Sequence, residues 1–374
     1  MRLAWYNIVH DRTRFLVTVL GITCAVFLMT FQGSILLGFL EAASKIIDST
    51  DADLWITGRG VQCFEFPVPI ERRFVEIAHS IPGVDRTSRI CTRLVQFRKS
   101  DGSHQLVALI GADPEVGKQF PMPHLPGSSG AISPQALLVD ASNVQLLKVA
   151  THRLPQDVEV NEQRARVVGS TSGFSSFLGS PYVFTSYSDA SRYMRLRPDE
   201  TMFILVKVQP GLAIKEVQRE LRTRLRNVDI WSREEFSWRA RLYWITQTGA
   251  GGAIVTAALL GFFIGLAVVS QAMYATTMEN IEEFATLKAL GASHGFILRV
   301  VVVQALICGI IGYVLGVLLT NPLIDAAKSK IPWVATPWWL PLGMLVPAIA
   351  MCILASMISV RAALSVEPAK VFRA

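Results

Sequence analysis

The stretch Thr277-Met-Glu-Asn-Ile-Glu-Glu-Phe-Ala-Thr-Leu-Lys-Ala-Leu-Gly-Ala292 is a polar segment between two long segments without charged side chains. At about 100° per residue, one side of a helix over this stretch carries the apolar side chains: Ile281, Phe284 and Ala285, with Leu287 at the edge. The opposite side carries the polar ones: Glu279, Glu282, Glu283 and Thr286. Lys288 stands in the last turn, where a cation suits the helix dipole, and Gly291 follows where a left-handed C-cap is wanted. The stretch therefore predicts a short amphipathic helix with an acidic face, held at a membrane surface.

Such a helix could lie on lipid, bind a protein partner, or be an ordinary polar loop that happens to be helical. Anionic lipid would repel the clustered glutamates, and helices that lie on membranes usually carry Lys and Arg on their polar face. A partner with a basic groove fits the acidic face better. We therefore expect a protein-docking helix, with the ordinary loop as the alternative.

The composition of the whole chain indicates an integral membrane protein. It has 374 residues, 51% of them hydrophobic, and a mean hydropathy of +0.39, which is too apolar for one soluble globule. Four stretches lack Asp, Glu, Lys and Arg for long enough to cross about 30 Å of hydrocarbon: Phe15–Leu40, Leu242–Met278, Val300–Ile324 and Ile331–Val360. The first is too long for the apolar region of a secretion signal, so we expect a permanent span. The expected spans are residues 15–40, 242–276, 300–324 and 338–360.

The orientation of these spans is predicted from their flanking cations: Arg2, Arg12, Arg14, Arg361, Lys370 and Arg373. By the positive-inside rule both termini are expected in the cytoplasm, which also places the loop 277–299 inside. Residues 41–241 and the loop 325–337 then lie outside. Arg239 and Arg241 argue mildly against this, but long domains cross largely regardless of charge. The remaining cytoplasmic segments are an amphipathic elbow and a tail: 1–14 and 361–374.

The long outer segment 41–241 alternates strand and helix patterns, which predicts a mixed α+β domain large enough for its own core. A hairpin is expected from Arg89–Arg98 to Gln105–Ile110 around a Ser-Asp-Gly-Ser turn. A strand, an amphipathic helix and a strand are expected over Thr201–Val208, Ile214–Arg226 and Asp229–Trp231. Other expected elements are a strand, a helix and a second hairpin: Asp53–Thr57, Arg72–His79, and Val158–Val160 with Arg166–Gly169.

The segment Glu283-Phe-Ala-Thr-Leu-Lys-Ala-Leu-Gly-Ala292 resembles the E-[IFY]-[AG]-x-[LI]-[KR]-A-[LM]-G motif of MacB/FtsX-type ABC transporter permeases. In that family this segment is the cytoplasmic coupling helix that docks on the ATPase subunit. Three outer segments look like the DevC-like and heme-efflux (HrtB-like) permeases within the family: Asp51-Ala-Asp-Leu-Trp55, Ala108-Leu-Ile-Gly-Ala112 and Glu159–Gly169. With Arg361–Phe372, the resemblance covers nearly the whole chain. Many relatives carry Arg where this chain has Asn280, so a salt bridge formed there is in doubt here.

The resemblance implies an α-helical membrane protein with four spans and a large extracytoplasmic α+β domain of the MacB periplasmic type. It implies a homodimeric permease that works with a separate ABC ATPase, so ATP and magnesium would bind to the partner and this chain would be neither an enzyme nor a cofactor binder. Efflux of a hydrophobic or amphiphilic substrate, with a membrane-fusion protein and an outer-membrane duct, would follow. The residues that would couple to the ATPase are Glu279, Ile281, Glu282, Glu283, Phe284, Leu287, Lys288 and Gly291.

Catalytic, metal and nucleotide motifs are absent from the sequence. Gly111–Gln119 has five residues between its glycines instead of four, and Gln where a phosphate-binding loop has Ser or Thr, so a turn is expected. No block of charge is dense enough to suggest nucleic acid. Two small-residue pairs are expected to pack helices closely: Gly261 with Gly265, and Gly312 with Gly316.

The cysteines divide between the spans and the outer segment. Cys63 and Cys91 both fall outside, where disulfides persist. Two thiols alone do not show that they pair, so free thiols are favoured and a Cys63–Cys91 disulfide is the second hypothesis.

Two other functions compete with efflux. An FtsX/LolC-type permease would use the same movement to regulate cell-wall hydrolases or to release lipoproteins. A membrane-anchored sensor or binding domain would have no ATPase at all.

Overall fold

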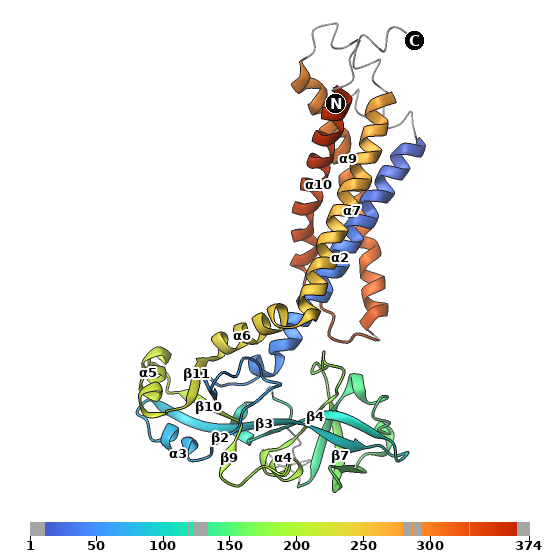
Figure 1. Ribbon diagram of the computed structural model, residues 1–374. Coiled ribbons are helices and arrows are strands. Elements are labelled where there is room, and N and C mark those ends of the chain that lie inside the picture. Colours follow the sequence, from blue (N-terminus) through green and yellow to red (C-terminus); the bar gives the residue numbers. More distant parts are fainter. Residues whose placement is uncertain are drawn as a thin grey trace. The chain divides into compact units, whose positions relative to one another are not determined.

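The computed structural model describes residues 12–117, 120–122, 134–279, 286, 293–328 and 330–364. The chain forms two compact units (Figure 1). The helical unit comprises Met1–Gly38 with Ala250–Ala374, and the sheet unit comprises Phe39–Gly249. Helix α2 (Arg12–Asp48) contributes to both units without interruption.

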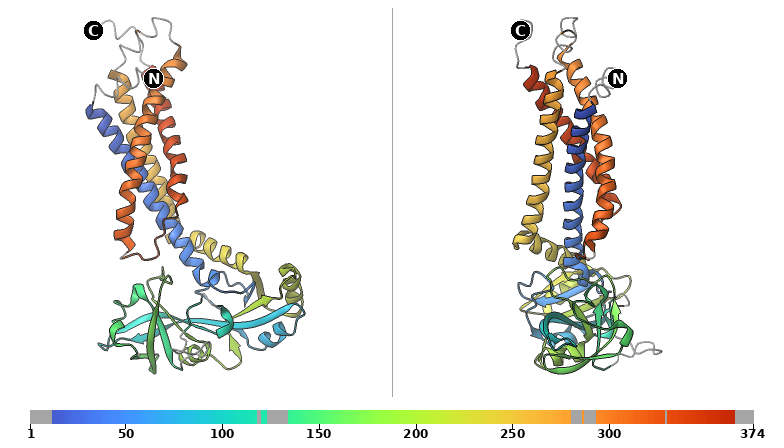
Figure 2. Two further views of the ribbon diagram at one scale, coloured as in Figure 1. Left: turned by 180° about the vertical axis from the view of Figure 1, so that it is seen from behind. Right: turned by 90° about the vertical axis from the view of Figure 1, so that its right-hand side faces the viewer.

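In the described part of the helical unit there are four long helices: α2, α7 (Gly249–Glu279), α9 (His294–Lys328) and α10 (Trp339–Leu364). Each contains a stretch long and apolar enough to cross a membrane, which confirms the prediction of four apolar helices. Figure 2 shows them side by side from two directions. Helix α2 continues beyond Leu40, where the apolar run ends, and α7 begins only at Gly249.

The core of the helical unit is built from side chains of all four helices, among them Val26 of α2, Val269 of α7, Cys308 of α9 and Met351 of α10. Buried hydroxyl groups on α2 are satisfied by the helix itself. Thr23 Oγ1 donates to Val19 O at 2.7 Å, and Thr30 and Ser34 make the same bond one turn back. Such bonds remove the cost of placing a hydroxyl in an apolar bundle.

One part of the sheet unit is a four-stranded antiparallel sheet in the order β11-β1-β10-β3. Its strands are β1 (Leu54–Gly58), β3 (Val84–Arg98), β10 (Phe203–Val208) and β11 (Val228–Ser232). Helix α3 (Phe74–His79) joins β1 to β3, and α5 (Ile214–Arg224) joins β10 to β11. These two split β-α-β units give the ferredoxin-like arrangement.

Alternation along β1 gives each face of this sheet its own core. Leu54 and Ile56 lie on the face covered by α3 and α5. Trp55 lies on the opposite face, with its ring centroid 5.6 Å from that of Phe203 and 5.3 Å from that of Phe236 on α6 (Arg233–Thr246).

The other part of the sheet unit is a closed ring of strands that begins in the second half of β3. The order β3-β4-β8-β5-β7-β6 returns to β3, where Phe97 pairs with Val160. The added strands are β4 (His104–Ala112), β5 (Ala136–Asp140), β6 (Gln156–Val160), β7 (Gln163–Thr171) and β8 (Tyr182–Ser186). Helix α4 (Tyr187–Tyr193) follows β8, and a short ribbon pairs β2 (Ile70–Glu71) with β9 (Glu200–Thr201). Three short 3-10 helices are η1 (Pro114–Val116), η2 (Ala141–Asn143) and η3 (Thr151–Arg153).

The elements expected from sequence in this unit are confirmed, with shifted ends. The two predicted hairpins are β3–β4 and β6–β7, and the predicted strand–helix–strand is β10–α5–β11. Helix α6 was not expected, although Ser232-Arg-Glu-Glu235 forms the capping box that starts it. Residues 242–246, assigned from sequence to the second span, belong to α6.

Candidate functional site

The predicted ATPase-coupling residues fall largely outside the described part of the chain. Glu279 is the last residue of α7 and is exposed, and Thr286 is helical and exposed. The other coupling residues lie outside the described residues: Ile281, Glu282, Glu283, Phe284, Leu287, Lys288 and Gly291. The acidic-faced helix therefore stays a prediction.

The four glycines predicted to pack helices all lie against α2. A Cβ at Gly265 of α7 would lie 2.3 Å from Ala25 Cβ, and one at Gly261 would lie 3.6 Å from Leu28 Cβ. On α9, a Cβ at Gly312 would lie 2.7 Å from Ile22 Cγ2, and one at Gly316 would lie 2.9 Å from Val26 Cβ. Helix α2 is therefore the helix that both glycine pairs approach, and three of these contacts leave no room for a side chain.

The last turns of α2 are clamped to helix α6 within the sheet unit. Arg241 Nε donates to Ser44 Oγ at 2.9 Å, and Arg241 Nη2 lies 3.0 Å from Asp48 Oδ2. Arg233, at the start of α6, donates to the carbonyl of Thr50 at 3.2 Å. Arg241, which argued against the predicted orientation, therefore has a structural task as an anchor for α2.

An aromatic cluster reinforces this clamp. Phe39 of α2 packs edge-on against Phe177 and Trp244, with ring centroids 5.1 and 6.3 Å away. Phe177 and Trp244 are themselves 4.8 Å apart, and Phe66 lies 6.1 Å from Trp244. Edge-to-face rings at these separations attract one another beyond simple burial. The cluster thus joins α2, α6 and two loops of the sheet unit.

Glu65 lies at the centre of the contacts around this cluster. Its carboxylate accepts from Trp244 Nε1 at 3.3 Å and from Tyr182 Oη at 3.4 Å. Burial raises its pKa to about 7, against smaller opposing effects from its own backbone amide and from the hydrogen bonds of Trp244, Cys63 and Tyr182. Glu65 therefore links α6 to strand β8 and is poised to change charge near neutral pH. No sequence motif marks it, because its partners are far away along the chain.

In the structure Cys63 and Cys91 are buried, free thiols, the alternative that the sequence favoured over a disulfide. Cys91 lies in β3 and donates weakly to Gly111 O at 3.7 Å. Cys63 lies instead beside Glu65. Burial raises the pKa of each thiol to about 12, so both stay protonated at neutral pH. The two thiols are packed against different residues. Their common place in the outer segment, on which the disulfide hypothesis was based, does not show this.

A groove of about 550 Å³ lies at the end of α2. Its charged lining is mixed in sign: Asp48, Asp51, Arg86, Glu115 and Arg233. Asp51 is held by Lys207 at 3.0 Å and by Arg86 at 2.6 Å, and these cations lower the pKa of its carboxyl. We read the groove as the polar continuation of the clamp, since Asp51 pairs with Arg86, Asp48 pairs with Arg241, and Arg233 donates to the carbonyl of Thr50.

Two protein-family models match the chain. The MacB-like periplasmic core domain model matches residues 15–224, and the FtsX-like permease C-terminal model matches residues 255–368. An uncharacterized ABC transporter permease of Methanocaldococcus jannaschii is 30% identical over 166 residues, 42% of this chain and 41% of that relative. A Mycobacterium tuberculosis ABC transporter permease is 23% identical over 90% of this chain and 88% of its own length. One of Mycobacterium bovis is 24% identical over 97% of each chain.

Solved structures also resemble the chain at low identity. The periplasmic region of MacB from Actinobacillus actinomycetemcomitans is 12% identical with a TM-score of 0.38, covering 50% of this chain and 92% of that one. The extracellular domain of the ABC-type transporter YknZ from Gram-positive bacteria is 11% identical with a TM-score of 0.36, covering 48% and 98%.

The apolar helices and the matched periplasmic core domain define a membrane protein with a large extracytoplasmic domain. Since that model covers more than half of the chain and the permease model covers most of the rest, the chain belongs to the MacB/FtsX-type ABC transporter permeases. Its sequence relatives are ABC transporter permeases as well.

Proposed function

We propose that this chain is the permease subunit of an ATP-driven exporter, in which α2 carries movement from the helical unit to the sheet unit. One observation carries the proposal. Helix α2 is an uninterrupted helix of 37 residues, about 55 Å long at 1.5 Å per residue. Its first part is the most enclosed helix of the helical unit, and its last turns are clamped by Arg241 and the aromatic cluster. A continuous helix held at both ends transmits displacement instead of absorbing it.

The energy source in this proposal is a separate ABC ATPase that holds ATP and magnesium. The acidic-faced helix over 277–292 would dock in a basic groove of that partner, with Phe284 in the apolar contact. Both termini and this loop would then be cytoplasmic in a bacterial inner membrane, and two copies of the permease would work with two ATPases.

The cargo in this proposal is a hydrophobic or amphiphilic molecule that is already outside the inner leaflet. A membrane-fusion protein and an outer-membrane duct would carry it onward. The largely apolar core of the helical unit supports a mechanical mode, and the buried hydroxyls of Thr23, Thr30 and Ser356 are bonded to their own helix backbone. The same observation favours the second candidate, a permease that drives cell-wall hydrolases or releases lipoproteins by the same movement.

The docking step is tested by co-purification with a co-expressed ATPase of the ABC family. Phe284→Ala removes a large apolar contact, so assembly should weaken by on the order of 2–4 kcal/mol if Phe284 is a central anchor. Leu106→Ala, which removes an exposed apolar side chain of the sheet unit, is the matched control and should assemble normally. Reversing Glu282 and Glu283 to Lys should weaken association in a salt-dependent manner. Wild-type assembly by the Phe284 variant would rule out this segment as the coupling element.

A further inference from the structure

A pocket of about 260 Å³ lies between helix α4, the loop before β9 and the start of β3. Four arginines from separate elements line it: Arg72, Arg89, Arg192 and Arg197. Tyr187 and Glu200 are the other residues of its lining that bear on its chemistry. Four guanidinium groups around one small pocket repel one another unless negative groups compensate their charge.

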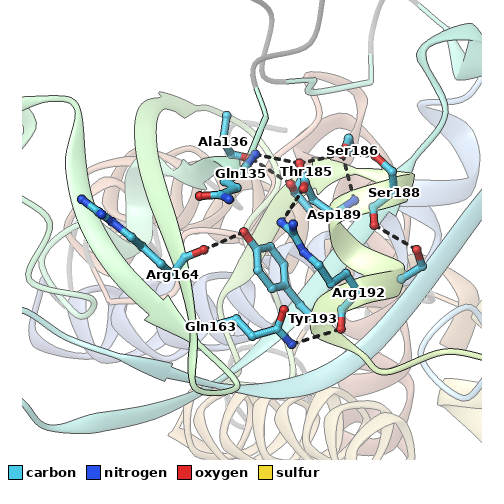
Figure 3. Close-up of polar contacts among 11 residues, drawn as sticks. Gln135, Ala136, Gln163, Arg164, Thr185, Ser186, Ser188, Asp189, Arg192 and Tyr193 are labelled. Atoms are coloured by element: carbon cyan, nitrogen blue, oxygen red, sulfur yellow. Dashed lines mark hydrogen bonds and ion pairs between the residues drawn. The ribbon is translucent and has the colours of Figure 1, made fainter.

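Two of the arginines are fixed in place by carboxylates behind them. Arg89 makes a bidentate pair with Asp113, at 2.8 and 2.9 Å, and its guanidinium lies 4.0 Å from the ring centroid of Tyr187. Arg192 Nη2 donates to Asp189 Oδ1 at 2.7 Å, as Figure 3 shows. The other oxygen of Asp189 is held by the Gln135 amide at 2.9 Å. These arginines are therefore preorganised, with N–H groups of Arg192 still unused.

The other two arginines are held much more loosely. Arg72 Nη1 donates to the carbonyl of Pro198 at 3.4 Å, and within the described part of the chain no carboxylate pairs with it. Arg197 Nη1 lies 3.6 Å from Glu200 Oε1, beyond hydrogen-bond distance, and its side chain is 77% exposed. Their backbone positions are nonetheless defined, since the Arg72 amide donates to Asp199 O at 2.7 Å and β2 pairs with β9.

The charges around the pocket therefore leave donors in excess. Among the described residues, the carboxylates that pair with or approach the four arginines are three: Asp113, Asp189 and Glu200. Each guanidinium has five N–H donors, and most of those on Arg72 and Arg197 have no acceptor among the described residues. A ligand that brings negative oxygens would use both the excess charge and the unused donors.

We propose that this pocket binds a phosphate group, carried by a soluble phosphate ester or by a lipid head group. Planar guanidinium forks match the oxygens of phosphate and bind them by paired, charge-assisted hydrogen bonds. The two inner arginines would set the position of the group, and the two outer arginines would close on it. This site goes beyond the proposed function, since neither α2 nor the ATPase-docking segment takes part in it.

The proposal is tested by isothermal titration of the full chain, purified in detergent and phosphate-free buffer. Glycerol 3-phosphate probes a free ester, and glycerophosphoglycerol probes the diester of a lipid head group. Saturable binding is expected for one of them, and the tighter of the two identifies the source of the phosphate. Arg72→Gln and Arg197→Gln should each weaken it at least about tenfold, the usual loss for one hydrogen bond to a charged group.

Arg98→Gln and Arg164→Gln are the matched controls, since both are exposed, ion-paired arginines of the same unit that line a different pocket. They should bind as the wild type does. The proposal is overturned if neither probe saturates the protein up to about 10 mM, a limit weaker than any specific site here would show. Equal losses in the control and pocket variants would overturn it too, because they would indicate non-specific attraction to basic surface.

Discussion

Helices α2 and α7 both cross the helical unit, yet they are built in opposite ways. In their most apolar windows, 44% of α2 is buried inside the chain but only 17% of α7. Glycines of α7 and α9 bring both helices against α2. Helix α7 instead turns large side chains outward, among them Leu259, Phe263 and Ile264. Helices α2 and α7 are therefore nearly equal in hydropathy but differ in burial: α2 is the central helix of the unit, and α7 is a peripheral one.

The difference teaches where the chain tolerates change. Between apolar helices in lipid there is little hydrophobic drive, so close packing of small residues decides which helices meet. Side chains on the outer face of α7, such as Leu259, Phe263 and Ile264, are more than half exposed, so their exact shape matters less. Each prediction below contrasts a tightly packed position with a matched loose one.

The largest effect is expected where α7 touches α2. Gly265→Val places a side chain where Ala25 Cβ is 2.3 Å away, so the helices must separate, at a cost of about 1–3 kcal/mol and with loss of the native bundle. Gly343→Val on α10 is the control, because a Cβ there meets nothing within 4 Å. Size-exclusion chromatography and thermal unfolding in detergent should separate the two variants. Equal behaviour of both would mean that the α2–α7 contact does not organise the unit.

A smaller effect is expected at the clamp between α2 and α6. Arg241→Ala removes the hydrogen bonds to Ser44 and Asp48. It should lower the free energy of unfolding by only about 1 kcal/mol, because the Arg241 and Asp48 side chains are partly exposed. Arg224→Ala breaks a comparably exposed pair with Glu220, but within one helix. Only the Arg241 variant should also lower ATPase activity that depends on the permease. An unchanged activity in that variant would show that the clamp is not needed for coupling.

A third effect is a pH dependence of stability at Glu65. Its folded pKa of about 7 lies above the ordinary value of 4.5, so the folded state holds a proton that the unfolded state has lost. Its stabilising contribution is full below pH 4.5 and disappears as the pH rises through 7.

In Glu65→Gln this part of the pH dependence should vanish, whereas Glu115→Gln, an exposed carboxylate, should keep it. The unfolding midpoint measured at intervals between pH 4.5 and 8 would show the change, on the order of 1–3 kcal/mol in wild type. A Glu65→Gln profile parallel to wild type would contradict the assignment.

The sequence was informative wherever the signal was local. Charge-free runs gave the four helices, the Ser-Asp-Gly-Ser turn gave the β3–β4 hairpin, and glycine spacing identified positions that do touch α2. Patterns of this kind depend only on residues close together in the sequence, so the helix or turn can be recognised without knowing the fold.

The parts that could not be predicted depend on distant contacts. The apolar run ends at Leu40, but α2 continues because Glu41 and Lys45 form an i,i+4 pair and Asp48 meets Arg241. The short, fully buried strand β8 has no alternation to reveal it. The free state of Cys63 and Cys91 follows from packing that their spacing does not encode.

The most direct test of the account breaks α2 between its two ends. Glu41 is exposed on α2, so Glu41→Pro interrupts the helix without removing a packed side chain, and Glu41→Ala is the matched control. Hydrogen exchange of the permease with its ATPase is measured with and without ATP. Wild type and Glu41→Ala should show ATP-dependent exchange in both units, whereas Glu41→Pro should show it in the helical unit alone. An ATP response that persists in the sheet unit of Glu41→Pro would contradict transmission through α2.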